Sequence, residues 1–369
     1  MTTDIINRLL KVKNTTCLSV IIPQFKISRN RMQNPEQIRK TIRKAKTILK
    51  RNASPTGKLM MEKLDSLLKS VHPDYYRSGI GLFVSPDVSE LVYFPFSVKE
   101  KIIYDTTFET RDLLYLRDFM SPYYAVVLSK KDIHLYSGTG DELVEIRDGI
   151  FPMHQDDTYE YARPGLGTSF GYAMKGFEKD KSIVTQQREE SFYREARQQL
   201  GVYFDRSQLP WVLAGTKKQV AEFYDATGWE DKAAGVVTGS YSAKNFFDLR
   251  TRAWSAYVDF RQQHVLNLVH TLKEEAEPNR LAKGIQEVWE AAHEGRGQLL
   301  VVEKDYMPRA YLRDGEPVLY LQPPQPRYTL VPDAVDSIIE TVLDKGGQVM
   351  FTEDKQLRPF DSIALQLRY

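Results

Sequence analysis

The sequence of 369 residues contains a single cysteine, Cys17, and only short uninterrupted apolar runs. One cysteine allows no disulfide within the chain, which is typical of proteins from a reducing cytoplasm. The longest apolar stretches, such as 123–128, fall well short of the roughly 20 residues that a membrane-spanning helix needs. The N-terminal residues also lack the continuous apolar core of a secretory signal. We therefore predict a cytoplasmic protein with no membrane partner, and we expect Cys17 to belong to the core rather than to act as a nucleophile.

Motifs that hold phosphate, metal or a catalytic serine are also missing. Neither "GIGLF" at 79–83 nor "RPGLGTSFG" at 163–171 carries the Lys-Ser/Thr of a nucleotide phosphate loop. No histidine pair has ligand spacing with a cysteine or carboxylate, and no nucleophile elbow occurs. We therefore predict that the protein has no small-molecule cofactor and no metal. We also predict a binding protein rather than an enzyme.

The composition that is present, 42% hydrophobic and 27% charged, is that of a globular protein. The net charge is only +2, but it is unevenly distributed. Between Lys26 and Lys58 the chain has eleven positive side chains and one negative, Glu36. A local excess of this kind favours a polyanionic partner.

A basic helix is predicted at about 35–51, because Ile38, Ile42, Ala45 and Leu49 share one face. Positive residues occupy the rest of its circumference, and we predict that they bind RNA phosphates without reading sequence. A solvated charged face is the alternative interpretation. The predicted RNA-binding residues of this helix are Arg39, Lys40, Arg43, Lys44, Lys46, Lys50 and Arg51.

Helical and strand patterns alternate along the chain and predict an α/β protein with three domains. Residues 1–118 form an N-terminal domain in which a predicted strand, "CLSVIIPQF" at 17–25, precedes the basic helix. Residues 119–275 begin with a strand meander and continue with helices at about 187–204 and 242–272. Residues 276–369 follow a Glu-Pro joint and alternate two helices with short strands. The helices are predicted at 280–293 and 333–344, and the strands at 298–302, 318–322, 347–351 and 362–368.

Several motifs in this order resemble the bacterial proteins related to archaeal and eukaryotic class 1 peptide-chain release factors and to Pelota. They include "CLSVIIPQF", "YYAVVLSKKDIHLYSG", "FYREARQQL", "AAHEGRGQLLVVEKD" and "LDKGGQVMFTED". The resemblance implies a ribonuclease-H-like middle domain and a C-terminal α/β/α sandwich like the kink-turn-binding ribosomal proteins. It also implies partners, namely the ribosome with its rRNA and tRNA, and a translational GTPase that docks on the C-terminal domain.

The tripeptide Gly-Gly-Gln at 346–348 is the sequence that such release factors use for hydrolysis, but there it lies in the middle domain. Here it follows an amphipathic helix and precedes "VMF", so we predict a left-handed helix cap. The matching middle-domain stretch, "GFEKDKSIVTQQREE" at 176–190, has no paired glycines, and we predict that the overlapping segment 174–188 is a loop. It offers Gln186 and Gln187 as candidate catalytic residues, and Lys175, Lys179 and Lys181 as candidate contacts to tRNA or rRNA.

The chain also lacks the Asn-Ile-Lys-Ser pattern of stop-codon readers and the Gly-Asn-Glu pattern of kink-turn binders. We therefore predict a release-factor-like protein that binds the ribosomal A site in rescue, stalling response or hibernation without catalysis of its own. The first alternative is a peptidyl-tRNA hydrolase that acts through the middle-domain loop. The second is a metal-dependent ribonuclease that uses the acidic stretch with Asp156, Asp157 and Glu160.

Overall fold

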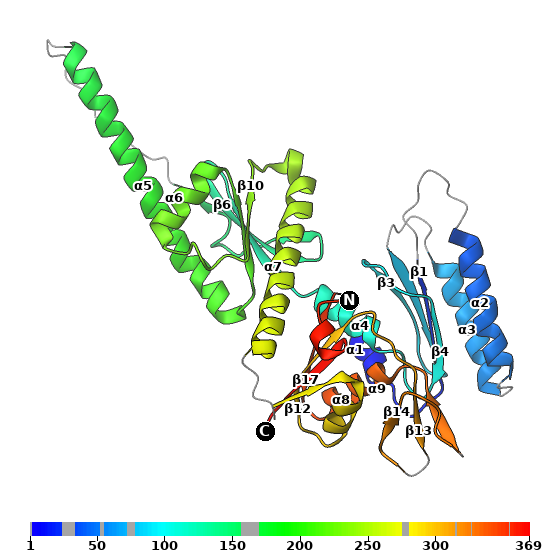
Figure 1. Ribbon diagram of the computed structural model, residues 1–369. Helices are drawn as coiled ribbons and strands as arrows, with labels where there is room; N and C mark the ends of the chain where they lie inside the picture. Colours follow the sequence, from blue (N-terminus) through cyan, green and yellow to red (C-terminus); the bar gives the residue numbers. More distant parts are fainter. Residues whose placement is uncertain are drawn as a thin grey trace. The chain divides into compact units, whose positions relative to one another are not determined.

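The computed structural model describes residues 2–23, 34–51, 55–71, 78–155, 170–274, 280–313, 316–325, 327–353 and 355–369. It divides into two compact units. We call Met1–Phe119 with Val265–Tyr369 the terminal unit and Met120–His264 the middle unit. Each unit packs helices on β-sheets, which confirms the α/β class (Figure 1). The division into three domains stays a prediction. Across the described ranges, no helix combines the length and apolar character needed to cross a membrane.

The first sheet of the terminal unit is antiparallel, with strand order β3-β2-β1-β4. Its strands are β1 (Cys17–Pro23), β2 (Gly79–Val84), β3 (Ser89–Phe94) and β4 (Lys101–Asp105). Helices α2 (Asn34–Arg51) and α3 (Pro55–Ser70) lie side by side and cover one face of this sheet (Figure 1). Strand β1 is buried along most of its length, as its run of apolar residues predicts.

The second sheet of the terminal unit has the order β11-β17-β12-β16, and only the β12–β16 pair is parallel. These strands are β11 (Leu281–Lys283), β12 (Gly297–Glu303), β16 (Gln348–Thr352) and β17 (Ile363–Leu367). Helices α8 (Gly284–His293) and α9 (Ala334–Asp344) pack on it through one apolar core. A small sheet of β13 (Ala310–Arg313), β14 (Leu319–Tyr320) and β15 (Tyr328–Val331), and the 3-10 turn η3 (Arg358–Phe360), complete this region.

Helix α1 (Thr2–Leu10) packs beside α4 (Arg111–Phe119), and the N-terminus of α4 faces that of α9. The Arg111 guanidinium donates to both carboxylate oxygens of Asp333. Asp333 also caps α9, since its Oδ1 accepts from the backbone N of Val335 at 3.1 Å. Asp336 caps α4 in turn, accepting from the backbone N of Thr110 and of Arg111 at 3.0 and 2.9 Å. The Asp336 cap on α4 and the Arg111–Asp333 pair thus join two chain segments that are far apart in sequence.

The middle unit has a mixed sheet with the order β10-β9-β5-β6-β7, and β8 (Met153–His154) pairs with β6. Strands β5 (Tyr123–Leu128), β6 (Asp132–Thr139) and β7 (Glu142–Glu145) form an antiparallel meander. Strands β9 (Trp211–Gly215) and β10 (Gly235–Thr238) continue it in parallel. The arrangement is consistent with the ribonuclease-H-like fold that the resemblance implies.

Helices cover both faces of this sheet. Alternate residues of β5 point to opposite sides, so Val126 and Leu128 meet helices α5 (Phe170–Ser207) and α6 (Lys217–Thr227). Ala125 and Val127 meet the first part of α7 (Phe246–Glu274), which follows the turn η1 (Ala243–Asn245). The middle unit is therefore a three-layer α/β/α sandwich.

Three predicted segments were wrong. Residues 174–188 are not a loop, because α5 already begins at Phe170. The helix-favouring residues of that segment give no regular apolar period that would reveal a helix. The helix predicted from 280 begins at Gly284, since Leu281–Lys283 pair with β17. The strand predicted at 318–322 is the two-residue β14, within a small sheet whose other strands we did not predict.

Candidate nucleic-acid interface

Helix α2 is anchored by the apolar stripe that the sequence predicts. Ile42, Ala45 and Leu49 are buried against the first sheet, and Ile38 is partly buried beside them. Their partners are β1 and β2 residues such as Val20. With this face fixed, the polar circumference of α2 must face away from the core. The predicted placement of the basic residues on the outer face is confirmed.

The seven basic residues of this face are not equivalent. Lys44 Nζ donates to Glu100 Oε1 at 2.7 Å, and Lys46 Nζ lies 2.5 Å from Asp65 Oδ1. The other five are exposed, and none of their side chains forms a hydrogen bond or ion pair with any residue that the structure describes. We call these five residues the free basic face: Arg39, Lys40, Arg43, Lys50 and Arg51.

The pairing of Lys44 has an electrostatic consequence. The hydrogen bond from Lys44 is the main cause that lowers the pKa of Glu100, and Gln37 adds a donor at 2.5 Å. Glu100 is therefore a stable anion that neutralises Lys44 locally. The free basic face keeps its positive charge, because no carboxylate of the described chain pairs with it. It is the strongest candidate for binding phosphates.

The middle-domain candidates lie on α5 rather than on a loop. Gln186 and Gln187 are exposed on this helix, where consecutive residues point in different directions. They do not form the glycine-rich loop that the hydrolytic alternative requires. Lys175, Lys179 and Lys181 also belong to α5, but the side chains of 170–185 lie outside the described part, so their RNA contacts stay a prediction.

The Gly-Gly-Gln tripeptide ends helix α9 as predicted. Gly346 has φ +74°, the left-handed conformation of a helix cap. Its N–H donates to Leu343 O at 3.0 Å, and the Gly347 N–H donates to Val342 O at 2.8 Å. A Cβ on Gly347 would come within 2.6 Å of Val342 Cγ1, so both glycines are explained by the turn. Gln348 then pairs with Leu299 at the start of β16.

The metal-binding and nucleophile hypotheses gain no support. Asp156, Asp157 and Glu160 lie outside the described residues, and His154 pairs with Asp132 at 2.7 Å. In the parts of the chain that can be described, no group of three His, Cys, Asp or Glu residues could hold a metal ion. Cys17 is buried in β1, and burial raises the pKa of its thiol to about 12, which agrees with its predicted core role.

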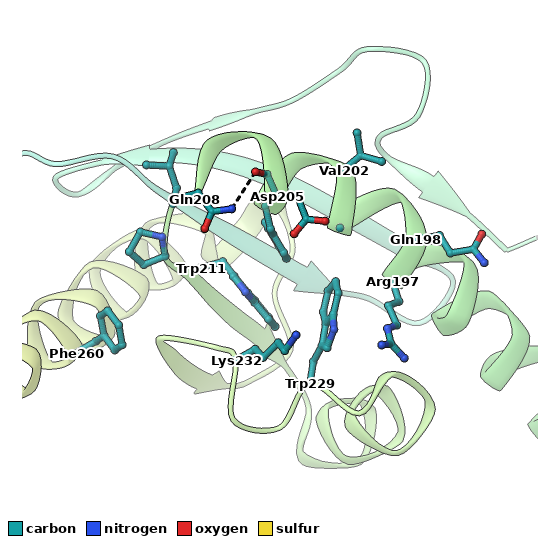
Figure 2. A pocket seen from close by; sticks show the side chains of 13 residues that line it. Arg197, Gln198, Val202, Asp205, Gln208, Trp211, Trp229, Lys232 and Phe260 are labelled. Atoms are coloured by element: carbon teal, nitrogen blue, oxygen red, sulfur yellow. Dashed lines mark hydrogen bonds between the residues drawn. The ribbon is translucent and has the colours of Figure 1, made fainter.

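Sequence analysis missed an open groove of about 730 Å³ on the middle unit (Figure 2). It runs along the last turns of α5 and reaches the start of β9, the segment after α6, and α7. Its aromatic residues come from four separate elements: Phe204, Trp211, Trp229 and Phe260. The only sequence signal was a glycine, Gly201, inside an otherwise regular helix pattern.

Comparison with known proteins supports the resemblance that the motifs indicate. The model of the family described as bacterial archaeo-eukaryotic release factor family 3 matches residues 122–296. This segment includes "YYAVVLSKKDIHLYSG", "FYREARQQL" and the groove. The family match confirms the resemblance to release factors. No curated protein sequence matches the chain.

Several solved structures are similar to the chain. Ribosome-bound archaeal Pelota, described together with ABCE1, is 11% identical, with 100% of this chain and 94% of that chain covered and a TM-score of 0.42. Dom34 from S. cerevisiae, a translation termination-like factor that interacts with Hbs1, is 12% identical, with 79% and 74% covered and a TM-score of 0.41. Pelota from Archaeoglobus fulgidus is 13% identical, with 100% and 92% covered and a TM-score of 0.39.

Proposed function

We propose that this chain, a bacterial archaeo-eukaryotic release factor-like protein, binds the ribosome through the free basic face of α2. It would enter the A site in rescue, stalling response or hibernation, and it would act by binding rather than by catalysis. The observation that carries this proposal is the presence of five exposed cations on one anchored helix with no anion paired to them in the described chain.

The spacing of the free basic face suits a phosphate backbone. Arg39 and Arg43 are four residues apart, so their side chains extend from adjacent turns of α2, and Lys40 follows Arg39 directly. Lys50 and Arg51 extend the charge to the last turn. Because such contacts go to phosphates, binding would tolerate different RNA sequences and weaken as salt is raised.

The C-terminal segment of the terminal unit is our proposed docking site for a translational GTPase. The family resemblance supports this proposal. The absence of a glycine-rich loop at Gln186 and Gln187 supports a protein without hydrolytic activity, since α5 continues through both residues.

Co-sedimentation with bacterial ribosomes at low and raised salt tests the proposed function. The test variant changes all five residues of the free basic face to Gln. A matched control changes five exposed cations elsewhere on the surface to Gln, with the same loss of charge: Lys130, Arg206, Lys217, Lys244 and Lys355. We expect salt-sensitive binding that the test variant loses and the control keeps. If both variants lost ribosome binding equally, the binding would depend only on the overall charge of the protein, and the proposal would be contradicted.

A peptidyl-tRNA release assay on the same ribosomes separates binding from hydrolysis. We expect no release by the wild-type protein. Release that disappears in a Gln186→Ala, Gln187→Ala variant would replace our proposal with the hydrolase alternative. A Gln348→Ala variant serves as the control, because Gln348 lies in the β12–β16 ladder.

A further inference from the structure

The groove of the middle unit has an aromatic floor. The rings of Phe204 and Trp211 stack with centroids 5.0 Å apart, and those of Trp211 and Trp229 are 5.6 Å apart. Phe260 of α7 adds a ring that is 37% exposed (Figure 2). The volume of about 730 Å³ lies in the range of roughly 300–1,000 Å³ typical of small-molecule sites. Trp211 and Trp229 are only 5% and 7% exposed, and Phe204 already covers one face of Trp211. A flat ligand ring would therefore meet the parts of these rings that reach the groove and the more exposed ring of Phe260.

One wall of the groove contains a glycine that folding does not require. Gly201 lies inside α5, where alanine would be more favourable for the helix. A Cβ built on Gly201 would have no other atom within 4 Å, so no packing demand of the described protein explains the missing side chain. Because Gly201 lines the groove, the missing side chain widens it and lets a ligand approach the helix backbone.

The end of the same wall is strained. Gln208 follows α5 with φ +54°, a left-handed conformation in which glycine is the usual residue. Its backbone N–H donates to Phe204 O at 2.8 Å, and its side-chain Nε2 donates to Asp205 O at 2.9 Å. The side-chain carbonyl is thereby held at the groove. Strain of this kind often accompanies a binding site.

Three charged side chains line the groove: Arg197, Asp205 and Lys232. The Arg197 guanidinium lies 5.8 Å from the centroid of the Trp229 ring. No side-chain hydrogen bond or ion pair to a described residue is formed by Arg197, Asp205 or Lys232. Arg197 and Asp205 are eight residues apart, or about 12 Å along the helix. A cation therefore marks one end of the wall and an anion the other.

We propose that this groove binds a nucleotide, with its base on the aromatic floor and its phosphate near Arg197 and Lys232. Stacking on aromatic side chains suits every base, since each has a flat π-face. Arg and Lys provide charge-assisted donors for phosphate. The Asp205 carboxylate and the Gln208 carbonyl can accept hydrogen bonds from base N–H groups, and Asp205 keeps the phosphate at the opposite end. The nucleotide is either free or an unpaired residue of an RNA chain.

This inference goes beyond the proposed function and does not depend on it. The groove belongs to the middle unit, whereas the free basic face belongs to the terminal unit. The two can therefore be tested separately. Groove variants that lose nucleotide binding but still co-sediment with ribosomes would leave the proposed function intact.

Tryptophan fluorescence of the full-length protein tests the inference. Two of the four tryptophans, Trp211 and Trp229, line the groove, so a stacked base should quench their emission. The probes are AMP, GMP, CMP and UMP in one arm and a short single-stranded RNA oligonucleotide in the other. Quenching by mononucleotides would identify a free nucleotide as sufficient, whereas quenching by the oligonucleotide alone would identify an RNA chain as the source.

Two variants keep both tryptophans and alter the groove. Gly201→Ala should raise the melting temperature, because alanine favours the helix, and yet weaken nucleotide binding. Arg197→Gln should raise the dissociation constant about tenfold, the effect of losing one charge-assisted hydrogen bond. Arg206→Gln, with the same charge change on the same helix but outside the groove, should bind like the wild type.

Three results would overturn the inference. The first is the absence of saturable quenching by either probe. The second is unchanged affinity in both Gly201→Ala and Arg197→Gln. The third is an equal loss of affinity in Arg206→Gln and Arg197→Gln, which would show attraction to the general charge of α5 rather than to a built site.

Discussion

The terminal unit uses charged residues in two opposite ways. On α2, five cations are exposed and have no carboxylate partner among the described residues. Between α4 and α9, the charged groups are packed into the interior and each one has a partner. An exposed charge contributes little to stability, because water solvates it equally well in the unfolded chain. The same residue types therefore hold the architecture together in one region, and in the other they are exposed for the RNA binding that we propose.

The buried cluster also shows why its charges must stay together. Lys101 Nζ lies 2.6 Å from Glu109 Oε1 and 2.8 Å from Asp112 Oδ2, and all three side chains are almost covered. Removing one partner of a buried pair leaves the other charge without water or a counterion. The orphaned Arg111 Nε already has no acceptor in this cluster. We therefore expect large effects on stability here and small ones on α2.

The largest expected effect comes from Asp333→Ala. This change removes both the partner of Arg111 and the cap of α9, so it should lower the free energy of unfolding by about 3–5 kcal/mol. Urea denaturation followed by circular dichroism measures the change. Arg39→Gln is the matched control and should stay within about 0.5 kcal/mol of the wild type. Similar values for the two variants would remove the distinction between the regions.

A second prediction concerns pH. Burial is the main cause that raises the pKa of Asp336 above its ordinary value of 3.8. The folded state therefore binds this proton more tightly than the unfolded state, and the contribution of Asp336 to stability falls as pH rises above about 4. The amide that Asp336→Asn introduces does not ionise, so the variant does not lose this stability as pH rises. We expect the stability of the wild type relative to the variant to fall from pH 4 to pH 7.

Urea denaturation at several pH values checks this prediction. Burial also raises the pKa of Glu109, which both proteins retain, so its contribution largely cancels in the comparison. Parallel stability curves for the wild type and Asp336→Asn would mean that Asp336 is ionised in the folded protein as readily as in the unfolded chain.

The smallest expected effect distinguishes paired from free cations on α2. Lys46→Gln breaks a partly exposed pair with Asp65 and should lower the free energy of unfolding by about 0–1 kcal/mol. Lys50→Gln should leave stability unchanged and weaken ribosome binding more than Lys46→Gln does, because Lys50 has no partner among the residues that the structure describes. Denaturation and co-sedimentation together measure both quantities. If Lys46→Gln weakened ribosome binding more than Lys50→Gln, the proposed role of the free basic face would be contradicted.

Sequence patterns predicted the parts of the fold that have a regular apolar period. The buried strands at Cys17–Pro23 and Tyr123–Leu128 and the helix ending at Asp344 were all predicted. The early start of α5 was not, because its first half has helix-favouring residues without a regular apolar stripe. Helix α4 was missed for another reason, since its start depends on Asp336 from a distant segment.

The candidate sites follow the same rule. Charge density along the sequence indicated α2, but it could not show that Glu100 and Asp65 pair with Lys44 and Lys46. These carboxylates come from other elements and meet α2 only in the folded chain. The groove could not be predicted from the sequence for the same reason, since Trp211 and Trp229 belong to different elements. Gly201 alone indicated it locally.

The most direct test of ribosome binding by α2 is the salt dependence of ribosome affinity. The logarithm of the association constant should fall linearly with the logarithm of salt concentration. Changing the free basic face to Gln should make the slope shallower by about 0.7–0.9 for each phosphate that the variant no longer neutralises, or roughly four for all five residues. An unchanged slope in this variant would contradict the claim that these five residues bind RNA.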